Sequence, residues 1–517
     1  MKSKVEVVAL EEDVLNLLDN QNRLILDMVS LISKNKRWYT VSEISASLNV
    51  VERTVQRYIH QLEDTIAQFN AAKRVQNQTI DITYEKYKGV YLTLNKGSNY
   101  AEFKDFILEN DLTLNILKQV MFEEFTSIKK YAMDYYVSES AIRKSLKKIE
   151  HFLDLYQLSL SKKECHVLGE EKRIRLVMYI LGWTIYRGKS WPFHMIDETK
   201  ILTTVDHFSE QVGLSYSVIQ RKQFANFLGV IVFRVRKKHY VTCEANWKDY
   251  VDLEALRSEL TIVDQFMKEY NIRIEAEIYY MVLLLQTKLK TYESLSVAEK
   301  IFARHKANNS DVYQATRAFI DGFEETFITI PEELEERFFV TSFCAHLYGR
   351  LFPNMYVDVD GYQVLGERNA YYPTLQRKMI GFLDRLYEQT QFDLFLEDGF
   401  LLPKYMLLFS SIVPVTYYEP TIRICLDSDL PYLVKHNMKE RLRDRYKYDF
   451  NLQFVEVEEA VSADMVLTNI PNTLEEELRD TNKVHLFDFP IKRRDFTEIE
   501  RKLMSISQEM AESPHLN

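Results

Sequence analysis

The stretch VVERTVQRYIHQLE, Val50–Glu63, returns eighty-seven residues later as VSESAIRKSLKKIE, Val137–Glu150. Apolar residues match at four positions, which are Val50/Val137, Val55/Ile142, Ile59/Leu146 and Leu62/Ile149. Charges match at three positions, which are Glu52/Glu139, Arg57/Lys144 and Glu63/Glu150. This spacing is typical of a helix with one buried face. The chain therefore encodes the same helix twice, each time with basic side chains on its outer face.

A shorter helix is predicted just before the first copy. The segment Thr40–Asn49 has apolar residues at helical spacing, a capping hydroxyl at Thr40 or Ser42, and an asparagine suited to the helix end. Two short helices joined by a tight turn form a helix-turn-helix unit, whose second helix enters the DNA major groove. The positions exposed for that purpose are Glu52, Arg53, Thr54, Gln56, Arg57 and His60. Arginine can read guanine, glutamine can read adenine, and threonine and histidine can hold phosphates.

A β-hairpin is predicted to follow, in QTIDITYEKYKGVYLTLN, residues 78–95. Apolar residues alternate along both arms, and KYKG forms the bend. We interpret this hairpin as the wing of a winged helix, with Lys86 and Lys88 placed to touch a flanking phosphate.

The second copy lies in the same predicted order of a short helix, a turn, a second helix and a hairpin. TSIKKYAMDYY, residues 126–136, predicts the first helix, and LSLSKKECHVLG, residues 158–169, predicts a shorter wing. The expected DNA-binding positions are Ser138, which also caps the helix, then Glu139, Ser140, Arg143, Lys144, Lys147 and Lys148. A charged outer face is usually only a solvated surface, but two such units in one chain favour DNA binding.

Composition suits a globular protein of three or four domains, with 46% apolar and 27% charged residues in 517. The four cysteines form no CxxC pair, which argues against a disulfide framework or a zinc site, so we expect no metal and no cofactor. The N-terminus does not resemble a secretory signal, and the longest apolar run, Tyr405–Val415, is too short to span a bilayer. We expect a cytoplasmic protein that makes no membrane contact.

The net charge of −10 does not by itself favour nucleic acid. Residues 1–170, however, carry 23 basic and 24 acidic side chains, so this part of the chain is close to neutral. A near-neutral segment can still present a basic face, because affinity follows the local charge at the phosphates.

Helical periodicity dominates the middle of the chain and predicts two similar bundles. Three histidines lie there, His207 directly after Asp206, His305 and His346. A lone histidine in a helical domain is most often a surface or a satisfied core residue. The functional alternative is phosphorylation of an imidazole that a carboxylate orients.

After about residue 419 the pattern changes to alternating strands and helices, which predicts a small parallel sheet with helices on its faces. The strands are TIRICLD, LQFVEVEE, ADMVLTNIP and KVHLFDF, and the helices are YLVKHNMKERLRDRY, TLEEELRD and DFTEIERKLMSISQEM. Cys425 ends the first strand, where ligands bind in open α/β sheets. The following residues include two aspartates and no glycine, so a buried strand cysteine is favoured over a phosphate carrier.

This order of domains resembles the Mga/AtxA family of Gram-positive transcriptional regulators, several of which control virulence. The resemblance is carried by TVSEISASLNVVERTVQRYIHQLE, YYVSESAIRKSLKKIEHFL and LGEEKRIRLVMY. It implies a mainly α fold with two winged helix-turn-helix domains, two all-α phosphotransferase-regulated (PRD-like) bundles and a C-terminal EIIB-like α/β domain. The expected bounds are 1–98, 99–172, 173–290, 291–415 and 416–517.

The resemblance also implies control by the sugar phosphotransferase system, through its protein HPr. VDHF is similar to the family's first phosphorylation site, which points to His207, and His346 occupies a roughly corresponding helix in the second bundle. The family's second site falls on Leu283-Leu284 here, so this chain departs from the pattern there. The resemblance further implies a homodimer through the C-terminal domain, promoter DNA as ligand, an activating role, and RNA polymerase as a candidate partner.

Two alternatives stay open at this point. One is a phosphotransferase-type enzyme component that uses Cys425, which the loop after that residue disfavours. The other is an RNA-binding antiterminator with the same regulatory bundles. Such proteins begin with a small β-rich domain, whereas residues 1–100 predict helices and one hairpin.

Overall fold

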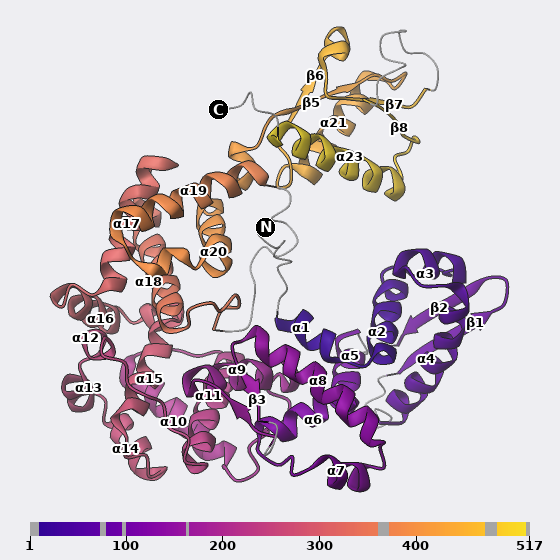
Figure 1. Ribbon diagram of the computed structural model, residues 1–517. Coiled ribbons are helices and arrows are strands. Elements are labelled where there is room, and N and C mark those ends of the chain that lie inside the picture. The colour runs from indigo at the N-terminus through magenta and orange to yellow at the C-terminus, as the bar shows by residue number, and fades with distance from the viewer. Residues whose placement is uncertain are drawn as a thin grey trace.

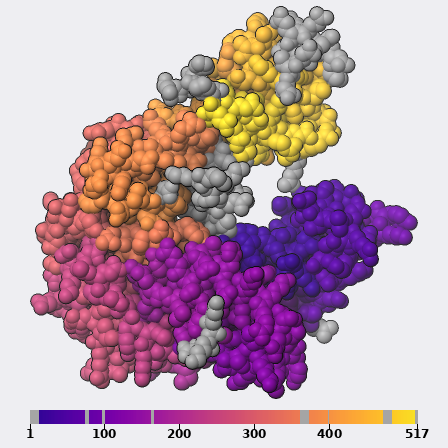
Figure 2. Space-filling view, viewed as in Figure 1, coloured from indigo at the N-terminus to yellow at the C-terminus, as the bar shows by residue number. Residues whose placement is uncertain are grey.

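The computed structural model describes residues 10–72, 79–95, 100–161, 165–359, 372–470 and 483–512. The described elements follow an open arc, with the first winged helix near one end and the C-terminal sheet at the other (Figures 1 and 2). One apolar core runs from Val14 to Val415, while the C-terminal sheet has apolar clusters of its own.

The first winged helix comprises α2 (Asn20–Ser33), α3 (Val41–Leu48), α4 (Glu52–Ala72), β1 (Ile80–Glu85) and β2 (Gly89–Leu94). α2 packs on α4 and β2, and α3 packs on α4. The two strands are antiparallel, with Ile80 opposite Leu94, so the predicted hairpin is confirmed. Before this module, α1 (Leu10–Leu17) packs against the second module instead.

The second winged helix repeats this order after a linking helix. Its elements are α5 (Tyr100–Asn110), α6 (Leu112–Met121), α7 (Ile128–Tyr135), α8 (Glu139–Leu155), β3 (Ser159–Leu160) and β4 (Val167–Leu168). The second hairpin is shorter than the first, as expected. Part of its bend, residues 162–164, lies outside the described residues.

The middle of the chain is helical, as the periodicity predicts. Its first elements are α9 (Glu171–Tyr186), α10 (Glu198–Val212), α11 (Val218–Arg236), α12 (Trp247–Tyr250), α13 (Leu253–Glu259), α14 (Thr261–Glu269) and α15 (Glu275–Gln286). The next are η2 (Leu289–Glu293), α16 (Leu295–Ala307), α17 (Asp311–Thr326), α18 (Glu332–Leu351), α19 (Pro373–Thr390), η4 (Asp393–Leu396), α20 (Asp398–Ser410) and η5 (Val415–Tyr418). α9 packs on α11, and α17 packs on α18 and α19. Several of these helices, α15 and α18 among them, are buried on most sides, so they build a continuous core.

The C-terminal domain is the predicted parallel α/β sheet. Its elements are β5 (Ile422–Leu426), α21 (Tyr432–Tyr446), β6 (Leu452–Val455), η6 (Val457–Ser462), β7 (Met465–Thr468), β8 (Val484–Leu486) and α23 (Arg493–Glu512). The strand order is β6-β5-β7-β8 with every pair parallel. The expected helix TLEEELRD, residues 473–480, lies outside the described residues.

Candidate nucleic-acid interface

The two helix-turn-helix units correspond residue for residue at the eighty-seven-residue offset. Their first helices, α3 and α7, begin at Val41 and Ile128 and have the same length. The second helices begin at Glu52 and Glu139, again at matching positions. The repeat in the sequence is therefore a repeat of backbone structure.

Local hydrogen bonds explain why each first helix begins where it does. The Thr40 hydroxyl accepts from the backbone N–H of Glu43 at 3.1 Å, and the Glu43 carboxylate accepts from the backbone N–H of Thr40 at 2.8 Å. This is a capping box, which satisfies two donors at the helix start. In the second unit Ser127 caps alone, accepting from the N–H of Lys130 at 3.2 Å.

Each first helix ends on a residue in the left-handed conformation. These residues are Asn49, with φ 51°, and Tyr136, with φ 55°. Asparagine adopts this conformation readily, whereas tyrosine does so rarely. The next N–H in each unit then bonds back to the helix, from Val50 to the Ser45 carbonyl and from Val137 to the Ala132 carbonyl. The tight turn is thus built the same way twice.

The outer face of α4 carries most of the predicted positions. Glu52, Arg53, Gln56, Arg57 and His60 are exposed, while Thr54 is half-buried. The inner face is buried as predicted, through Val55, Ile59, Leu62 and Ile66. The first two turns of α4 therefore present cationic and amide groups to solvent, while the opposite face is fixed in the apolar core.

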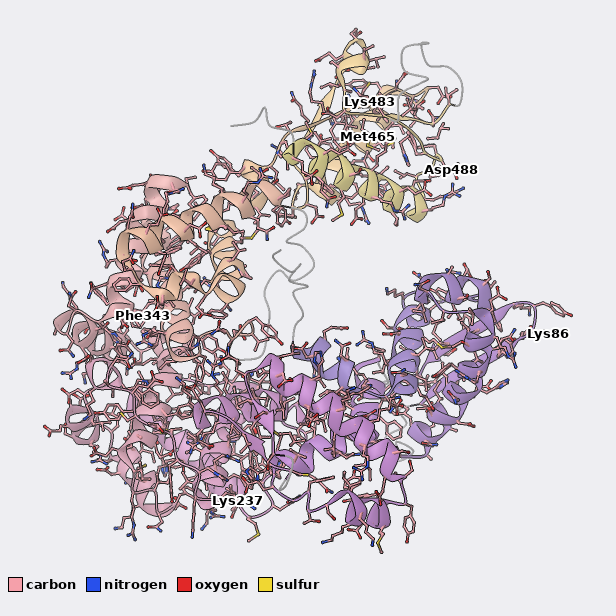
Figure 3. The ribbon with its side chains drawn as sticks, viewed as in Figure 1. Lys86, Lys237, Phe343, Met465, Lys483 and Asp488 are labelled. Atoms are coloured by element: carbon pink, nitrogen blue, oxygen red, sulfur yellow. The ribbon has the colours of Figure 1, made fainter. Side chains whose placement is uncertain are left out.

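A backbone contact joins the hairpin to the segment just before α3. Tyr39 and Val90 exchange two backbone hydrogen bonds of 2.8 Å each. Gly89 adopts φ 94°, and a Cβ there would lie 2.0 Å from the Tyr39 carbonyl oxygen, so only glycine fits. Figure 3 shows Lys86 near the outer tip of the hairpin. Lys86 and Tyr87 line one groove together with Gln56 and His60 of α4.

Two of the basic groups in this first unit already have acidic neighbours. Lys88 pairs with Glu85 at 2.6 Å, and His60 Nδ1 lies 3.2 Å from Glu63. Both pairs are exposed, so each contributes little to stability, and both basic side chains can exchange partners.

The second unit presents a denser set of cations. Arg143, Lys144 and Lys147 are exposed on α8, and Arg143 lies 3.3 Å from Glu139 one turn earlier. The Ser138 hydroxyl caps the helix, accepting from the Ala141 N–H at 3.2 Å, and lies 3.0 Å from the Ser140 hydroxyl.

Lys148 does not join this surface. It is half-buried, and its ammonium donates to the Leu17 and Leu18 carbonyls at the end of α1. Burial lowers the pKa of this ammonium. The expectation that Lys148 contacts DNA stays a prediction, and this geometry disfavours it because the hydrogen bonds satisfy helix-end carbonyls that would otherwise lack partners.

The three histidines of the middle region differ in their surroundings. His207 is exposed on α10, while its neighbour Asp206 binds Arg221 through both carboxylate oxygens at 2.5 Å. Asp206 is therefore bonded to Arg221 of α11 and does not orient the His207 imidazole. This arrangement leaves the His207 ring open to a partner protein.

His346 is a satisfied core histidine. Its side chain is fully buried, with Nδ1 2.8 Å from the Thr316 hydroxyl and Nε2 2.6 Å from the Tyr405 hydroxyl. Because Thr316 donates its hydrogen to the Val312 carbonyl, it accepts from Nδ1, and Nε2 accepts from Tyr405. Burial lowers the His346 pKa to about 3. The expectation that His346 is phosphorylated stays a prediction, and the burial of both ring nitrogens disfavours it.

His305 is buried in the same manner. Its Nδ1 lies 2.7 Å from the Ser310 hydroxyl, and burial lowers its pKa to about 4. Cys425 is also buried, which raises the pKa of its thiol to about 11 and favours the protonated, unreactive form. Neither group is poised for phosphoryl transfer.

A buried ion network that the sequence did not reveal joins the second winged helix to the first bundle. Arg234 of α11 donates to Glu123, after α6, at 2.8 Å and to Glu171 of α9 at 2.7 Å. Glu171 also accepts from Arg175, which is fully buried and pairs with Glu277 of α15. These partners lie up to 111 residues apart in sequence, so helical periodicity offers no signal for them.

Across the described residues, no helix is both long enough and apolar enough to cross a membrane.

In a comparison with known protein families, the part of the chain that matches a family model includes the second helix-turn-helix unit. Residues 98–181 match the Mga helix-turn-helix domain. The chain is 20% identical over 307 residues to "Capsule synthesis positive regulator AcpA" of Bacillus anthracis, covering 58% of this chain and 61% of that protein. It is 22% identical over 311 residues to "Capsule synthesis positive regulator AcpB", with the same coverage. It is 22% identical over 220 residues to "Anthrax toxin expression trans-acting positive regulator", covering 42% and 43%. The chain thus spans about 61% of the length of the first two relatives.

Proposed function

We propose that this chain, as a member of the Mga/AtxA family of transcriptional regulators, binds promoter DNA through both winged helices and activates transcription. The observation that carries this proposal is the matching register of the two helix-turn-helix units. Each unit exposes the first two turns of its second helix, which is the geometry that major-groove binding requires.

The chemistry of the exposed residues supports a mixed mode of binding. Arg53 and Arg57 in the first unit, and Arg143, Lys144 and Lys147 in the second, can contact phosphates or guanine edges. Because the whole chain carries a net charge of −10, binding depends on these local cations, and salt should weaken it steeply. Lys86 on the wing adds a phosphate contact outside the groove.

Regulation is proposed to act through His207. A phosphoryl group there adds a charge of about −1.5 to −2, by analogy with other phospho-residues, next to the Asp206–Arg221 pair. It would compete with Asp206 for Arg221 and so loosen the contact between α10 and α11. The donor would be HPr of the sugar phosphotransferase system, acting on PRD-like bundles in the cytoplasm.

The C-terminal EIIB-like domain is proposed to form the homodimer contact. Tyr432 and Leu433 at the start of α21 are strongly exposed, and Val457 and Val461 of η6, which follows edge strand β6 in sequence, are about half exposed. Exposed apolar groups of this kind mark interaction surfaces. RNA polymerase remains a candidate partner of the DNA-bound protein.

Duplex-DNA binding followed by fluorescence anisotropy across a salt series tests the main proposal. Arg53→Ala/Arg57→Ala and Arg143→Ala/Lys144→Ala should each weaken binding and flatten the salt dependence. Lys300→Ala/Lys306→Ala, which removes the same charge from exposed positions on α16, is the matched control and should bind as wild type. If the wild-type protein fails to bind any duplex at low salt, the proposal is wrong, and binding to RNA hairpins becomes the next measurement.

A further inference from the structure

A cavity of about 310 Å³ lies between the two helical bundles. Phe224 and Gln223 of α11 and Lys288 after α15 line it from the first bundle. Thr341 of α18 and Lys404 of α20 line it from the second. Cavities at such junctions are common ligand sites, because a ligand there can contact both units.

One wall of the cavity is aromatic. Tyr216 and Phe227 flank Phe224, with ring centroids 5.7 Å and 6.3 Å from it, and Phe400 contributes from α20. Flat apolar rings pack against the C–H faces of a sugar or another flat organic group. This wall favours an organic ligand over a bare hydrated ion.

The polar lining is cationic. Three lysines reach the cavity, Lys288, Lys290 and Lys404, against one aspartate, Asp358. Lys404 pairs with Asp358 at 2.9 Å, with both side chains 19% exposed, and Lys290 pairs with Glu293, so two of the three positive charges are offset and the cavity keeps a net charge of one. A net positive lining in a partly desolvated cavity attracts an anion, and lysine ammonium groups are frequent phosphate ligands.

We infer that this cavity binds a monosaccharide phosphate. Its lysines would hold the phosphate, Gln223 and Thr341 would meet the hydroxyl groups, and the aromatic wall would cover the ring. The volume lies at the lower end of the range for small-molecule sites, roughly 300–1,000 Å³, which favours one sugar ring over a larger nucleotide. By bridging the bundles, the ligand would stabilise one of their relative arrangements. The inference goes beyond DNA binding and does not depend on it.

Thermal unfolding of the full-length protein with glucose 6-phosphate as the probe tests this inference without DNA. The midpoint should rise with millimolar probe and should not rise with glucose, because ligand binding to the folded state stabilises it. Lys288→Met/Lys404→Met should weaken binding by at least about tenfold through loss of charge-assisted contacts. Lys300→Met/Lys306→Met removes the same charge elsewhere and should respond as wild type.

Three results would overturn the inference. These are no midpoint shift with glucose 6-phosphate, an equal shift with inorganic phosphate, which would indicate an adventitious ion only, and an unchanged response in the lysine variant. Gln223→Trp provides a second test if the lysine variant does not fold. This half-buried position can carry a larger side chain that fills the cavity, so the response should disappear. A retained response in Gln223→Trp would also contradict the inference.

Discussion

Tyr356 donates its phenolic hydrogen to Asp13 Oδ2 over 2.7 Å, although 343 residues separate the two. Tyr156, at the end of α8, donates to the same oxygen at 2.6 Å, and its ring lies 5.5 Å from that of Tyr356 in a stacked arrangement. One buried carboxylate thus joins α1, the second winged helix and the segment that follows α18. This contact physically connects the proposed DNA-reading helix to the second bundle.

Two substitutions of Asp13 should show whether its hydrogen bonds or its negative charge stabilise the contact between α1 and the two tyrosines. Burial raises the Asp13 pKa, so ionisation of this group costs free energy in the folded state. Asp13→Asn keeps an oxygen that accepts from both tyrosines and should leave the junction intact. Asp13→Ala removes the acceptor that both hydroxyls share and should lower the free energy of local opening by about 1–3 kcal/mol.

Amide hydrogen exchange in α1 measures this difference. Exchange over residues 10–17 should be much faster in Asp13→Ala than in Asp13→Asn, with the C-terminal domain unchanged in both. Equal exchange in the two variants would show that the hydrogen bonds do not hold α1 in place.

The two lysines Lys144 and Lys148 should differ in their effect on DNA binding. Lys144 is exposed on the outer face of α8, whereas Lys148 is bonded to the end of α1. Lys144→Ala should reduce the slope of log K against log salt by about 0.9, the value for one lost phosphate contact. Lys148→Ala should leave the slope unchanged and reduce the protection of α1 from exchange. A reduced salt slope in Lys148→Ala would restore this residue to the DNA surface.

Local rules predicted the elements of this fold well. The cap at Thr40, the helix end at Asn49, the hairpin bend at Lys86 and the limits of α21 depend on residues that are close in sequence. The burial and hydrogen bonding of Lys148 and His346 depend instead on which elements pack against α8 and α18, the helices that carry them. Helical spacing gives Lys148 and Lys144 similar surface positions, and only the docking of α1 distinguishes them. Burial of His346 likewise required its partners Thr316 and Tyr405, which are distant in sequence.

Stability should fall as the pH falls from about 6.5 towards 4. His305 and His346 have folded-state pKa values of about 4 and about 3, below the ordinary value of 6.5. In this window the unfolded chain binds protons that the folded chain does not, so each histidine costs up to about 1.4 kcal/mol per pH unit. His346→Gln removes one of the groups that bind a proton in the unfolded chain in this pH window.

Unfolding midpoints across this pH range check the prediction. The variant should be less stable than wild type near neutral pH, because a glutamine fits the two partners less well, but its stability should fall less steeply with acid. Buried carboxyls with raised pKa, such as Asp13 and Glu419, act equally in both proteins and cancel in the comparison. Parallel pH profiles would show that His346 titrates normally.

Arg234 should be among the most sensitive positions in the chain. Its side chain is 4% exposed and forms ion pairs with both Glu123 and Glu171. Although burial raises the pKa of Glu171, its pairs with Arg234 and Arg175 hold that pKa below the usual value. Arg234→Met removes the cation that both carboxylates share, but Glu171 keeps Arg175 and Glu123 keeps His239, so the loss should be about 1.5–3 kcal/mol.

Urea denaturation, monitored on the first unfolding transition, tests this expectation against Arg236→Met, an exposed neighbour on the same helix. Arg234→Lys should be intermediate, because a single ammonium cannot donate to both carboxylates in the forked geometry of a guanidinium. In both Arg234 variants the second winged helix should separate from the first bundle before the bundles unfold, since residue 234 of the first bundle then holds Glu123 of the second winged helix less firmly. If Arg234→Met unfolds at the same urea concentration as Arg236→Met, the network contributes nothing to this junction.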